Sequence, residues 1–303
     1  MQYDVAIIGA GWAGANAAKE ARDLGLKVIL IEKGPLGGTC LNRGCIPTKA
    51  LIQSAKIFNL TKKTRNFGVS IDNPNIDFSQ IQARKEKLVG QLRQGLDFTL
   101  KGVEIIQGEA KVISVSCIRI TDKEIQAKAI IVASGSRPMQ LEALKFDGQK
   151  VLSSDEILEI KKVPGSLLVI GGGVIGCEFA SLFASLGASV TIVEKLPQLL
   201  PGIDREVVKK LEIIFKKKGI KVNTNSDAKN FSFSDYELVL LCIGRTANSR
   251  GFGLEEVGVK IEREKICVDE YLRTNVPGIY GAGDCTGQVM LAHFASYQGV
   301  IAA

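Results

Sequence analysis

Two cysteines five residues apart form the most chemistry-specific pattern in the sequence. Cys40 and Cys45 lie in the run Gly37-Gly-Thr-Cys-Leu-Asn-Arg-Gly-Cys-Ile-Pro-Thr-Lys49. In a regular helix their Cα atoms would be about 8.7 Å apart, whereas a disulfide needs them within about 6.8 Å. Joining them requires an irregular backbone, which Gly44 and the Gly37-Gly38 entry allow. Strained, accessible disulfides are oxidising and labile, so the spacing predicts a redox-active pair.

Lys49 lies one helical turn beyond Cys45, where its charge would favour a thiolate. A purely structural disulfide and a zinc site are the alternatives. The first is unusual in a reducing cytoplasm, and the second needs four ligands, for which Cys285 and His293 are only isolated candidates. We therefore expect no metal. The remaining cysteines are interpreted as small apolar core residues: Cys117, Cys177, Cys242, Cys267 and Cys285.

The elements that precede this pair form a dinucleotide-binding pattern. A strand-like run, Tyr3–Ile8, leads into Gly9-Ala-Gly11-Trp-Ala-Gly14, and a helical pattern follows over 13–24. A second strand over 27–31 ends in Glu32. The glycines let the backbone approach a pyrophosphate at the positive end of a helix, and the acid can accept hydrogen bonds from a ribose diol.

The same pattern recurs later in the chain. Residues 167–170 precede Gly171-Gly-Gly173-Val-Ile-Gly176, and a strand over 189–193 ends in Glu194. The acid follows the first glycine by 23 positions in both copies. Two full patterns at matched spacing predict two dinucleotide sites. A carboxylate at position 194 would repel a 2′-phosphate, which favours NAD over NADP despite the neighbouring Lys195.

These repeats predict an α/β protein with two Rossmann-like dinucleotide-binding domains, the second inserted in the first. Turn-rich closures at 134–138 and 244–248 suggest a first domain over 1–142 and 272–303 and a second over 143–271. The final residues look helical and stop without a capping signal. The sequence therefore looks cut short, and we expect a C-terminal dimerisation domain to be absent.

Composition limits the class of partner. The 303 residues carry a net charge of +7, yet basic runs such as Lys62–Arg65 and Lys216–Lys218 are short, and aromatic residues make up 6%. This argues against nucleic-acid binding. No apolar run is long enough to span a membrane, and the chain enters a strand at once, without a signal peptide. We expect a cytoplasmic protein with neither nucleic-acid nor membrane partners.

The cysteine run closely resembles the active-site motif of the class I pyridine nucleotide–disulphide oxidoreductase family, and within it that of the dihydrolipoamide dehydrogenases. The likeness covers essentially the whole chain, including Ser134–Pro138, Gly244-Arg245, Gly281-Ala-Gly-Asp284 and Leu291-Ala-His293. It implies FAD in the first site and NAD in the second. The implied FAD contacts are Gly9, Gly11, Gly14, Glu32, Lys33, Thr39, Lys49, Ala110, Gly135, Asp284 and Ala292. The implied NAD contacts are Gly171, Gly173, Gly176 and Glu194.

The resemblance also implies residue roles. Cys40 would exchange with a disulfide substrate, Cys45 would lie against the flavin, and Glu178 would pair with Lys49. The implied reaction converts dihydrolipoamide and NAD⁺ to lipoamide and NADH. Two alternatives remain: a related reductase of the glutathione or mercuric type, and a flavin-binding protein or subunit that never turns over a disulfide.

The family resemblance implies partners as well. A lipoyl-bearing protein of a 2-oxo acid dehydrogenase or glycine cleavage complex would supply the substrate. A homodimer is expected only where the interface domain is present, because that domain forms the dimer and supplies a His–Glu pair. The one histidine of this chain, His293, lies in the motif beside the flavin and is not assigned as that base. We therefore expect weak activity from this chain alone.

Overall fold

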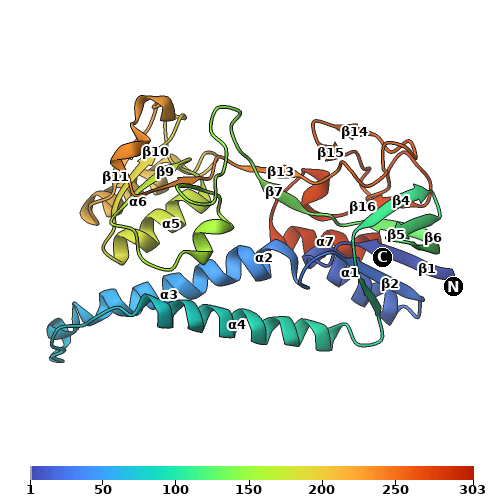
Figure 1. Cartoon of the computed structure of the whole chain (residues 1–303), viewed down its shortest axis with the longest axis horizontal. Helices are drawn as coiled ribbons and strands as arrows, with labels where there is room; N and C mark the ends of the chain where they lie inside the picture. The colour runs from blue at the N-terminus through green and yellow to red at the C-terminus, as the bar shows by residue number, and fades with distance from the viewer. Residues whose placement is uncertain (1) are drawn as a thin grey trace. The chain divides into compact units, whose positions relative to one another are not determined.

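The protein contains two compact α/β units, each built around its own sheet (Figure 1). The structure, a computed structural model, describes residues 2–303. The first unit comprises residues up to 42, 89–137 and 245–303, and the second comprises 43–88 and 138–244. The predicted fold class, an α/β protein with Rossmann-like units, is confirmed.

Within the described residues, seven strands form the sheet of the first unit. Their order is β3-β2-β1-β6-β5-β4, and β16 also pairs with β6. The strands β3, β2, β1, β6 and β16 are parallel, whereas β4 and β5 form an antiparallel extension. The bounds are β1 Gln2–Ile8, β2 Val28–Glu32, β3 Glu104–Gln107, β4 Ala110–Ser114, β5 Cys117–Ile120, β6 Lys123–Val132 and β16 Ile279–Gly281. Continuous apolar runs in β1 and β2 are buried, as expected of parallel strands covered on both faces.

Helices and two small sheets complete the first unit. The helices are α1 Trp12–Asp23, α2 Gly38–Arg43, α7 Ala292–Ala302, the short 3₁₀ helix η5 Gly283–Thr286 and the second part of α4 Phe78–Thr99. The small sheets pair β7 Ser136–Pro138 with β13 Arg245–Ala247, and β14 Ile261–Glu262 with β15 Lys265–Ile266.

The second unit has a fully parallel sheet in the order β11-β10-β9-β12-β8. Its strands are β8 Val151–Leu152, β9 Ser166–Ile170, β10 Ser189–Val193, β11 Lys221–Asn223 and β12 Leu238–Leu241. Its helices are α3 Cys45–Thr61, the first part of α4, α5 Val174–Ser185 and α6 Arg205–Lys217, with the 3₁₀ helices η1 Thr64–Phe67, η2 Glu156–Glu159, η3 Ala228–Asn230 and η4 Phe233–Asp235. Both units therefore repeat the strand–turn–helix–strand order read from the sequence.

The chain returns to the first unit at Arg245, earlier than the predicted boundary at 272. Residues 245–271 belong there because Leu254, Val259 and Ile266 are buried in the core formed by the first sheet. Turn-forming residues in the sequence do not reveal this boundary, because these core positions lie between turns rather than in long strands.

Residues 43–88 pack in the second unit rather than the first. Leu51 and Phe78, from α3 and α4, are buried in the same core as Phe179 and Phe183 of α5. This segment lies inside the predicted first domain, 1–142, so the units interleave along the chain more often than the predicted boundaries allow.

Close packing between α1 and α7 sets the position of η5, which carries Asp284. A Cβ at Gly299 would lie 2.1 Å from the carbonyl oxygen of Ala13, so the two helix backbones nearly touch. The buried Gln298 side chain accepts a hydrogen bond of 2.8 Å from the backbone N–H of Gly283, the first residue of η5. The start of α1 and η5 are thus held together through α7.

This packing predicts that Gly299→Ala destabilises the protein. The added methyl group would overlap the Ala13 carbonyl, and overpacking of this kind costs roughly 2 kcal/mol. Gly95→Ala in α4 is the matched control, because its Cβ would meet no atom within 4 Å and a helical alanine gains about 0.5–1 kcal/mol over glycine. Urea midpoints followed by circular dichroism should move in opposite directions. Equal midpoints for the two variants would contradict the close approach of the helices.

Candidate functional site

The first glycine turn is shaped by two contacts that leave no room for a side chain. Gly9 has a φ of +100°, and a Cβ there would lie 2.4 Å from the carbonyl oxygen of Ala133. A Cβ at Gly14 would lie 1.8 Å from the carbonyl oxygen of Gly9. Gly11 begins α1 without a side-chain cap, so the amides of the first helical turn remain available to an anion.

Glu32 fixes this turn from the end of β2. Its Oε2 accepts a hydrogen bond of 2.6 Å from the N–H of Ala10, and its Oε1 accepts one of 2.8 Å from the N–H of Gly34. Each carboxylate oxygen has a second lone pair, so these bonds leave capacity for a ribose hydroxyl. The backbone role was not predicted from the sequence; the ribose role stays a prediction.

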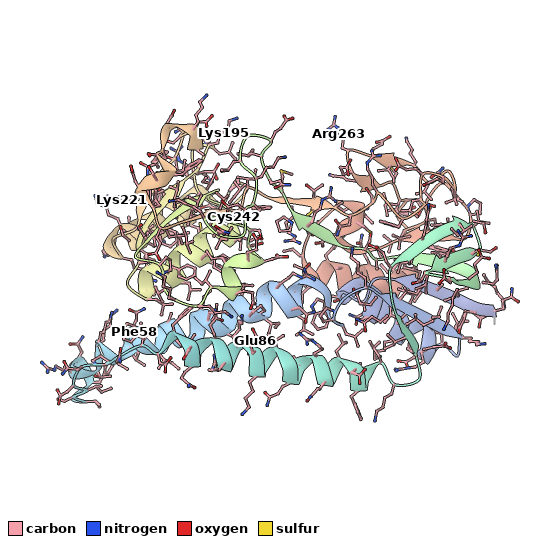
Figure 2. All side chains as sticks on the ribbon, viewed as in Figure 1. Phe58, Glu86, Lys195, Lys221, Cys242 and Arg263 are labelled. Atoms are coloured by element: carbon pink, nitrogen blue, oxygen red, sulfur yellow. The ribbon has the colours of Figure 1, made fainter. Side chains whose placement is uncertain are left out.

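The second glycine turn repeats this geometry. Gly171 has a φ of +110°, and its Cβ would lie 2.5 Å from the carbonyl oxygen of Cys242. A Cβ at Gly176 would lie 2.0 Å from the carbonyl oxygen of Gly171, and Gly173 caps α5 as Gly11 caps α1. Figure 2 labels Cys242 in this unit.

Glu194 is the counterpart of Glu32 and is buried. It accepts a hydrogen bond of 2.6 Å from the N–H of Gly172 and one of 2.7 Å from the N–H of Leu196. In each unit the acid at the strand end therefore accepts hydrogen bonds from two backbone N–H groups. In each unit this acid follows the first glycine by 23 positions.

A hydrogen-bond network in the first unit holds Asp284. The Ser136 hydroxyl donates to Asp284 Oδ2 at 2.6 Å, and Arg245 Nε donates to that hydroxyl oxygen at 2.8 Å. Arg245 Nη2 also donates to the Ser136 carbonyl at 2.8 Å. Sequence reasoning included these turns in the family pattern but gave Ser136 and Arg245 no role. The structure brings them together with Asp284 from distant parts of the chain.

The other residues predicted to contact FAD occupy several first-unit elements. Thr39 lies in α2, where Arg245 Nη2 approaches its hydroxyl at 3.5 Å. Gly135 has a φ of +72° and precedes β7, Ala110 is buried at the start of β4, and Ala292 begins α7. Lys33 is exposed and pairs with Glu109 at 3.3 Å.

Lys49 belongs to the second unit, where it pairs with Glu178. Lys49 Nζ lies 2.7 Å from Glu178 Oε1, which joins α3 to α5. The predicted partners are therefore in contact. Their role toward a flavin stays a prediction.

The two cysteines of the predicted pair lie in separate helices. Cys40 is half-buried in α2, and Cys45 is exposed at the first position of α3. Gly44 lies between the helices with φ −145° and ψ −116°, so the backbone departs from helical geometry where the sequence required it.

Four other cysteines are buried in the two cores. Burial raises the pKa of the Cys177 thiol to about 12, with the charge of Glu194 acting in the same direction. Burial also raises the pKa of Cys285 to about 11 and the pKa values of Cys117 and Cys242. Thiols held in the protonated form are poor nucleophiles, so these four are chemically quiet.

The residues of both glycine turns fit a dinucleotide. At the first and last glycine of each turn a Cβ would overlap a backbone carbonyl oxygen, whereas the space at the middle glycine, Gly11 or Gly173, is open. Each helix start also lacks a side-chain cap. In the first turn the indole Nε1 of Trp12 is buried and, among residues 2–303, has no hydrogen-bond partner. It is a donor that a bound ligand can satisfy.

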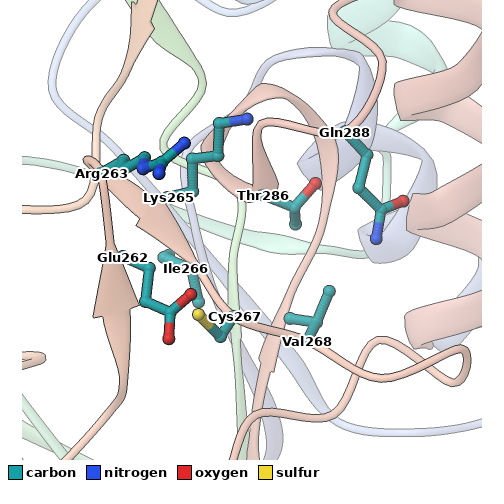
Figure 3. Close-up of a pocket in the computed structure, with 8 residues that line it drawn as sticks. All are labelled: Glu262, Arg263, Lys265, Ile266, Cys267, Val268, Thr286 and Gln288. Atoms are coloured by element: carbon teal, nitrogen blue, oxygen red, sulfur yellow. The ribbon is translucent and has the colours of Figure 1, made fainter.

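The first unit also contains a cavity of about 450 Å³ that is lined by other residues. The β14–β15 turn, the residues that follow it and the end of η5 line the cavity (Figure 3), and none of the predicted site residues is among them. Across residues 2–303 no cluster of three or more metal-ligating side chains occurs. Nor is any helix in this range both long and apolar enough to cross a membrane.

Comparison with known proteins agrees with this geometry. The family model described as pyridine nucleotide-disulphide oxidoreductase matches residues 3–299. A dihydrolipoyl dehydrogenase of Bacillus subtilis (strain 168) is 39% identical over 99% of this chain and 70% of its own length. One of Acholeplasma laidlawii is 38% identical over 99% of this chain and 95% of its own length.

Solved structures show the same likeness. The Cu(II) complex of RclA, an HOCl-induced flavoprotein disulfide reductase from Escherichia coli, superposes with a TM-score of 0.86 at 28% identity. The match covers 100% of this chain and 70% of that protein. FAD and NAD, predicted from the sequence, are the cofactors of these oxidoreductases. The chain therefore belongs to the pyridine nucleotide-disulphide oxidoreductase family and is a flavin-dependent oxidoreductase.

Proposed function

We propose that this chain performs the thiol chemistry of a dihydrolipoyl dehydrogenase, oxidising dihydrolipoamide to lipoamide with NAD⁺. The observation that carries the proposal is the Cys40/Cys45 pair, separated by the helix break at Gly44, in a chain about 39% identical to enzymes of that name. The carboxylate of Glu194 favours NAD over NADP, which supports this reaction over an NADP-dependent reductase.

The residues of the first unit would hold FAD and those of the second would hold NAD. Gly9, Gly11 and Gly14 shape the first cradle, and Gly171, Gly173 and Gly176 the second. Asp284, held by the hydrogen bond from Ser136, would accept hydrogen bonds from the flavin side chain. When bound, FAD supplies a two-electron acceptor for the dithiol and NAD⁺ supplies the final one.

The cysteines carry the substrate half of the proposed reaction. A thiolate of dihydrolipoamide attacks Sγ of Cys40 in the Cys40–Cys45 disulfide, which breaks that bond and releases the Cys45 thiolate. The second substrate thiolate then attacks the substrate sulfur of the mixed disulfide. Lipoamide leaves with its ring disulfide formed, and Cys40 departs as a thiolate. Two electrons have moved from the substrate to the cysteine pair.

Lys49 supplies positive charge on the helix that Cys45 begins. Cys45 is the first residue of α3, so Lys49 lies one helical turn along the same face. Its cation favours the Cys45 thiolate, and the ion pair with Glu178 holds the ammonium group in place. His293 is exposed at the second position of α7 and takes no part in the proposed thiol–disulfide exchange.

The proposed setting follows from the substrate. A cytoplasmic lipoyl-bearing protein of a 2-oxo acid dehydrogenase or glycine cleavage complex would present dihydrolipoamide to Cys40. The test is an anaerobic NADH titration of the purified chain followed by visible absorbance. Growth of a long-wavelength thiolate–flavin band after two electrons supports the relay, whereas bleaching without that band contradicts it.

Cys45→Ser should retain flavin and lose the long-wavelength band, because the alcohol does not ionise to replace the thiolate. Cys267→Ser is the matched control: it removes a half-buried thiol outside the proposed pair and should leave the band unchanged. Spectra of both variants after reduction decide the point. A band that persists in Cys45→Ser removes Cys45 from this role.

Alkylation of the reduced native chain at about pH 8 should separate the cysteines into two groups. Cys40 and Cys45 should react rapidly, whereas Cys117, Cys177, Cys242 and Cys285 should react only after unfolding. The buried thiols should react slowly because their raised pKa values leave almost no thiolate at this pH. Peptide mass spectrometry checks this. Rapid native labelling of Cys242 would show that the second core opens readily.

Glu32→Gln and Glu194→Gln form a matched pair that assigns the two sites. Each amide replaces a carboxylate that accepts two backbone N–H bonds, and its NH₂ group would face one of those donors. We expect Glu32→Gln to lower the flavin content of the purified chain. Glu194→Gln should keep the flavin and weaken NADH binding roughly tenfold, the effect of one charged hydrogen bond. The reverse pattern would exchange the FAD and NAD assignments.

A further inference from the structure

The helix that carries Cys40 is too short to be stable without help from the rest of the fold. α2 consists of the six residues Gly38–Arg43, and isolated helices shorter than about 12 residues are marginal in water. Of its six residues, Leu41 is buried. The place of Cys40 in the first unit therefore depends on the contacts that hold α2 and the loop before it.

The loop before α2 lies directly against the first glycine turn. The N–H of Gly37 donates to the carbonyl oxygen of Ala10 at 2.8 Å. A Cβ at Gly38 would lie 2.7 Å from the Cα of Gly11, and one at Gly37 would lie 2.2 Å from Cδ2 of Leu41. The loop therefore contacts the glycine turn on one side and the buried residue of α2 on the other.

The side chain of Asn42 fastens α2 to this loop. Its Nδ2 donates to the carbonyl oxygens of Leu36 and Gly38, both at 2.9 Å, and approaches that of Pro35 at 3.4 Å. All three partners are acceptors, so the amide nitrogen must face the loop. The amide oxygen then needs a donor from another part of the fold, because a half-buried acceptor without one is costly.

Arg93, in the part of α4 that belongs to the first unit, supplies this donor. Its Nε and Nη2 both donate to Asn42 Oδ1, at 3.1 and 2.8 Å. Figure 1 labels both helices, and the two side chains are half-buried. Hydrogen bonds from a charged donor are stronger than those between neutral groups. Reversing the amide would place donor against donor and acceptor against acceptor, so its orientation is fixed at both ends.

We propose that Arg93 is a positioning residue for the redox cysteines. It fixes the amide of Asn42, the amide holds α2 on its loop, and the loop lies on the turn where FAD would bind. The inference rests on the proposed function, in which Cys40 and Cys45 alternate between a disulfide and a dithiol. Arg93 acts through Asn42 and takes no part in the exchange itself.

A fixed α2 makes the disulfide easier to form. When α2 is held in place, the sulfur of Cys40 loses less conformational freedom on bonding to Cys45. When α2 can move, the effective concentration of one thiol at the other falls. Loss of the Arg93 contact should therefore shift the pair towards the dithiol.

The equilibrium between the cysteine pair and dithiothreitol tests the proposal. In this exchange two electrons and two protons pass from dithiothreitol to the Cys40–Cys45 disulfide, and dithiothreitol leaves as its cyclic disulfide. The purified chain is held anaerobically in buffers of reduced and oxidised dithiothreitol, alkylated, and examined by peptide mass spectrometry. Arg93→Ala should shift the equilibrium constant about tenfold towards the dithiol, the effect of one charged hydrogen bond. Arg93→Lys keeps a charged donor and should recover most of the shift.

Arg119→Ala is the matched control. Arg119 lies in β5 of the same unit, and its Nε and Nη2 also donate to a single oxygen, Oε1 of Glu124, at 3.2 and 2.7 Å. The variant removes the same kind of contact outside α2 and should leave the equilibrium unchanged. Thermal melts by circular dichroism measure stability separately. A lower melting temperature in Arg93→Ala with an unchanged equilibrium would show a merely structural role and overturn the proposal.

Asn42→Ala distinguishes action through Asn42 from a direct effect of the guanidinium charge on the cysteines. This variant should shift the equilibrium in the same direction as Arg93→Ala, and the double variant should shift it no further. An equal additional shift in the double variant overturns the proposal, because Arg93 would then act without Asn42. An equilibrium in Asn42→Ala like that of the parent chain also overturns it.

The parent chain separates this inference from the proposed function. If the parent forms no Cys40–Cys45 disulfide in any of the buffers, the proposed function fails and the role of Arg93 fails with it. If the parent forms the disulfide and Arg93→Ala has the same equilibrium constant, the proposed function stands and the positioning role alone is overturned.

Discussion

Each nucleotide-binding turn depends on one steric constraint: a glycine backbone lies directly against the carbonyl oxygen of a neighbouring chain segment. Gly9 meets Ala133 and Gly171 meets Cys242, where a Cβ would lie 2.4 and 2.5 Å from the oxygen and overlap it. With the glycine in place, the helix after the turn can start close to the strand ends. The acids Glu32 and Glu194 then hold the turn by its own amides. The cradle is therefore formed before any ligand binds, which lowers the entropic cost of binding.

The same close approach extends to the rest of the first unit. α1 begins at the turn, and Gly299 lets α7 pack against its backbone at Ala13. α7 holds Gly283, and the adjacent Asp284 is fixed by Ser136 and Arg245. Asp284 is thus positioned from two sides, by helix packing and by charge-assisted hydrogen bonds.

The sequence was most informative where structure is local. Strands, glycine turns and the strand-end acids follow from residues a few positions apart, and the structure places them where the pattern predicts. The network around Asp284 joins positions more than a hundred residues apart, so no local pattern reveals it. The packing of 245–271 with the first sheet and of α3 with α5 was missed for the same reason. In the sequence, a glutamate whose carboxylate binds backbone N–H groups of the turn also cannot be distinguished from one whose carboxylate binds a ribose.

The seven cysteines show how the fold selects among identical groups. Cys177 and Cys242 lie in an apolar core beside the buried carboxylate of Glu194, and both burial and that charge raise their thiol pKa values. Cys45 has the opposite surroundings: it is exposed at a helix start, with Lys49 one turn away on the same helix. A helix N-terminus and a cation both stabilise a thiolate. The reactivity proposed for Cys45 and the raised thiol pKa of Cys242 therefore follow from one electrostatic rule applied with opposite signs.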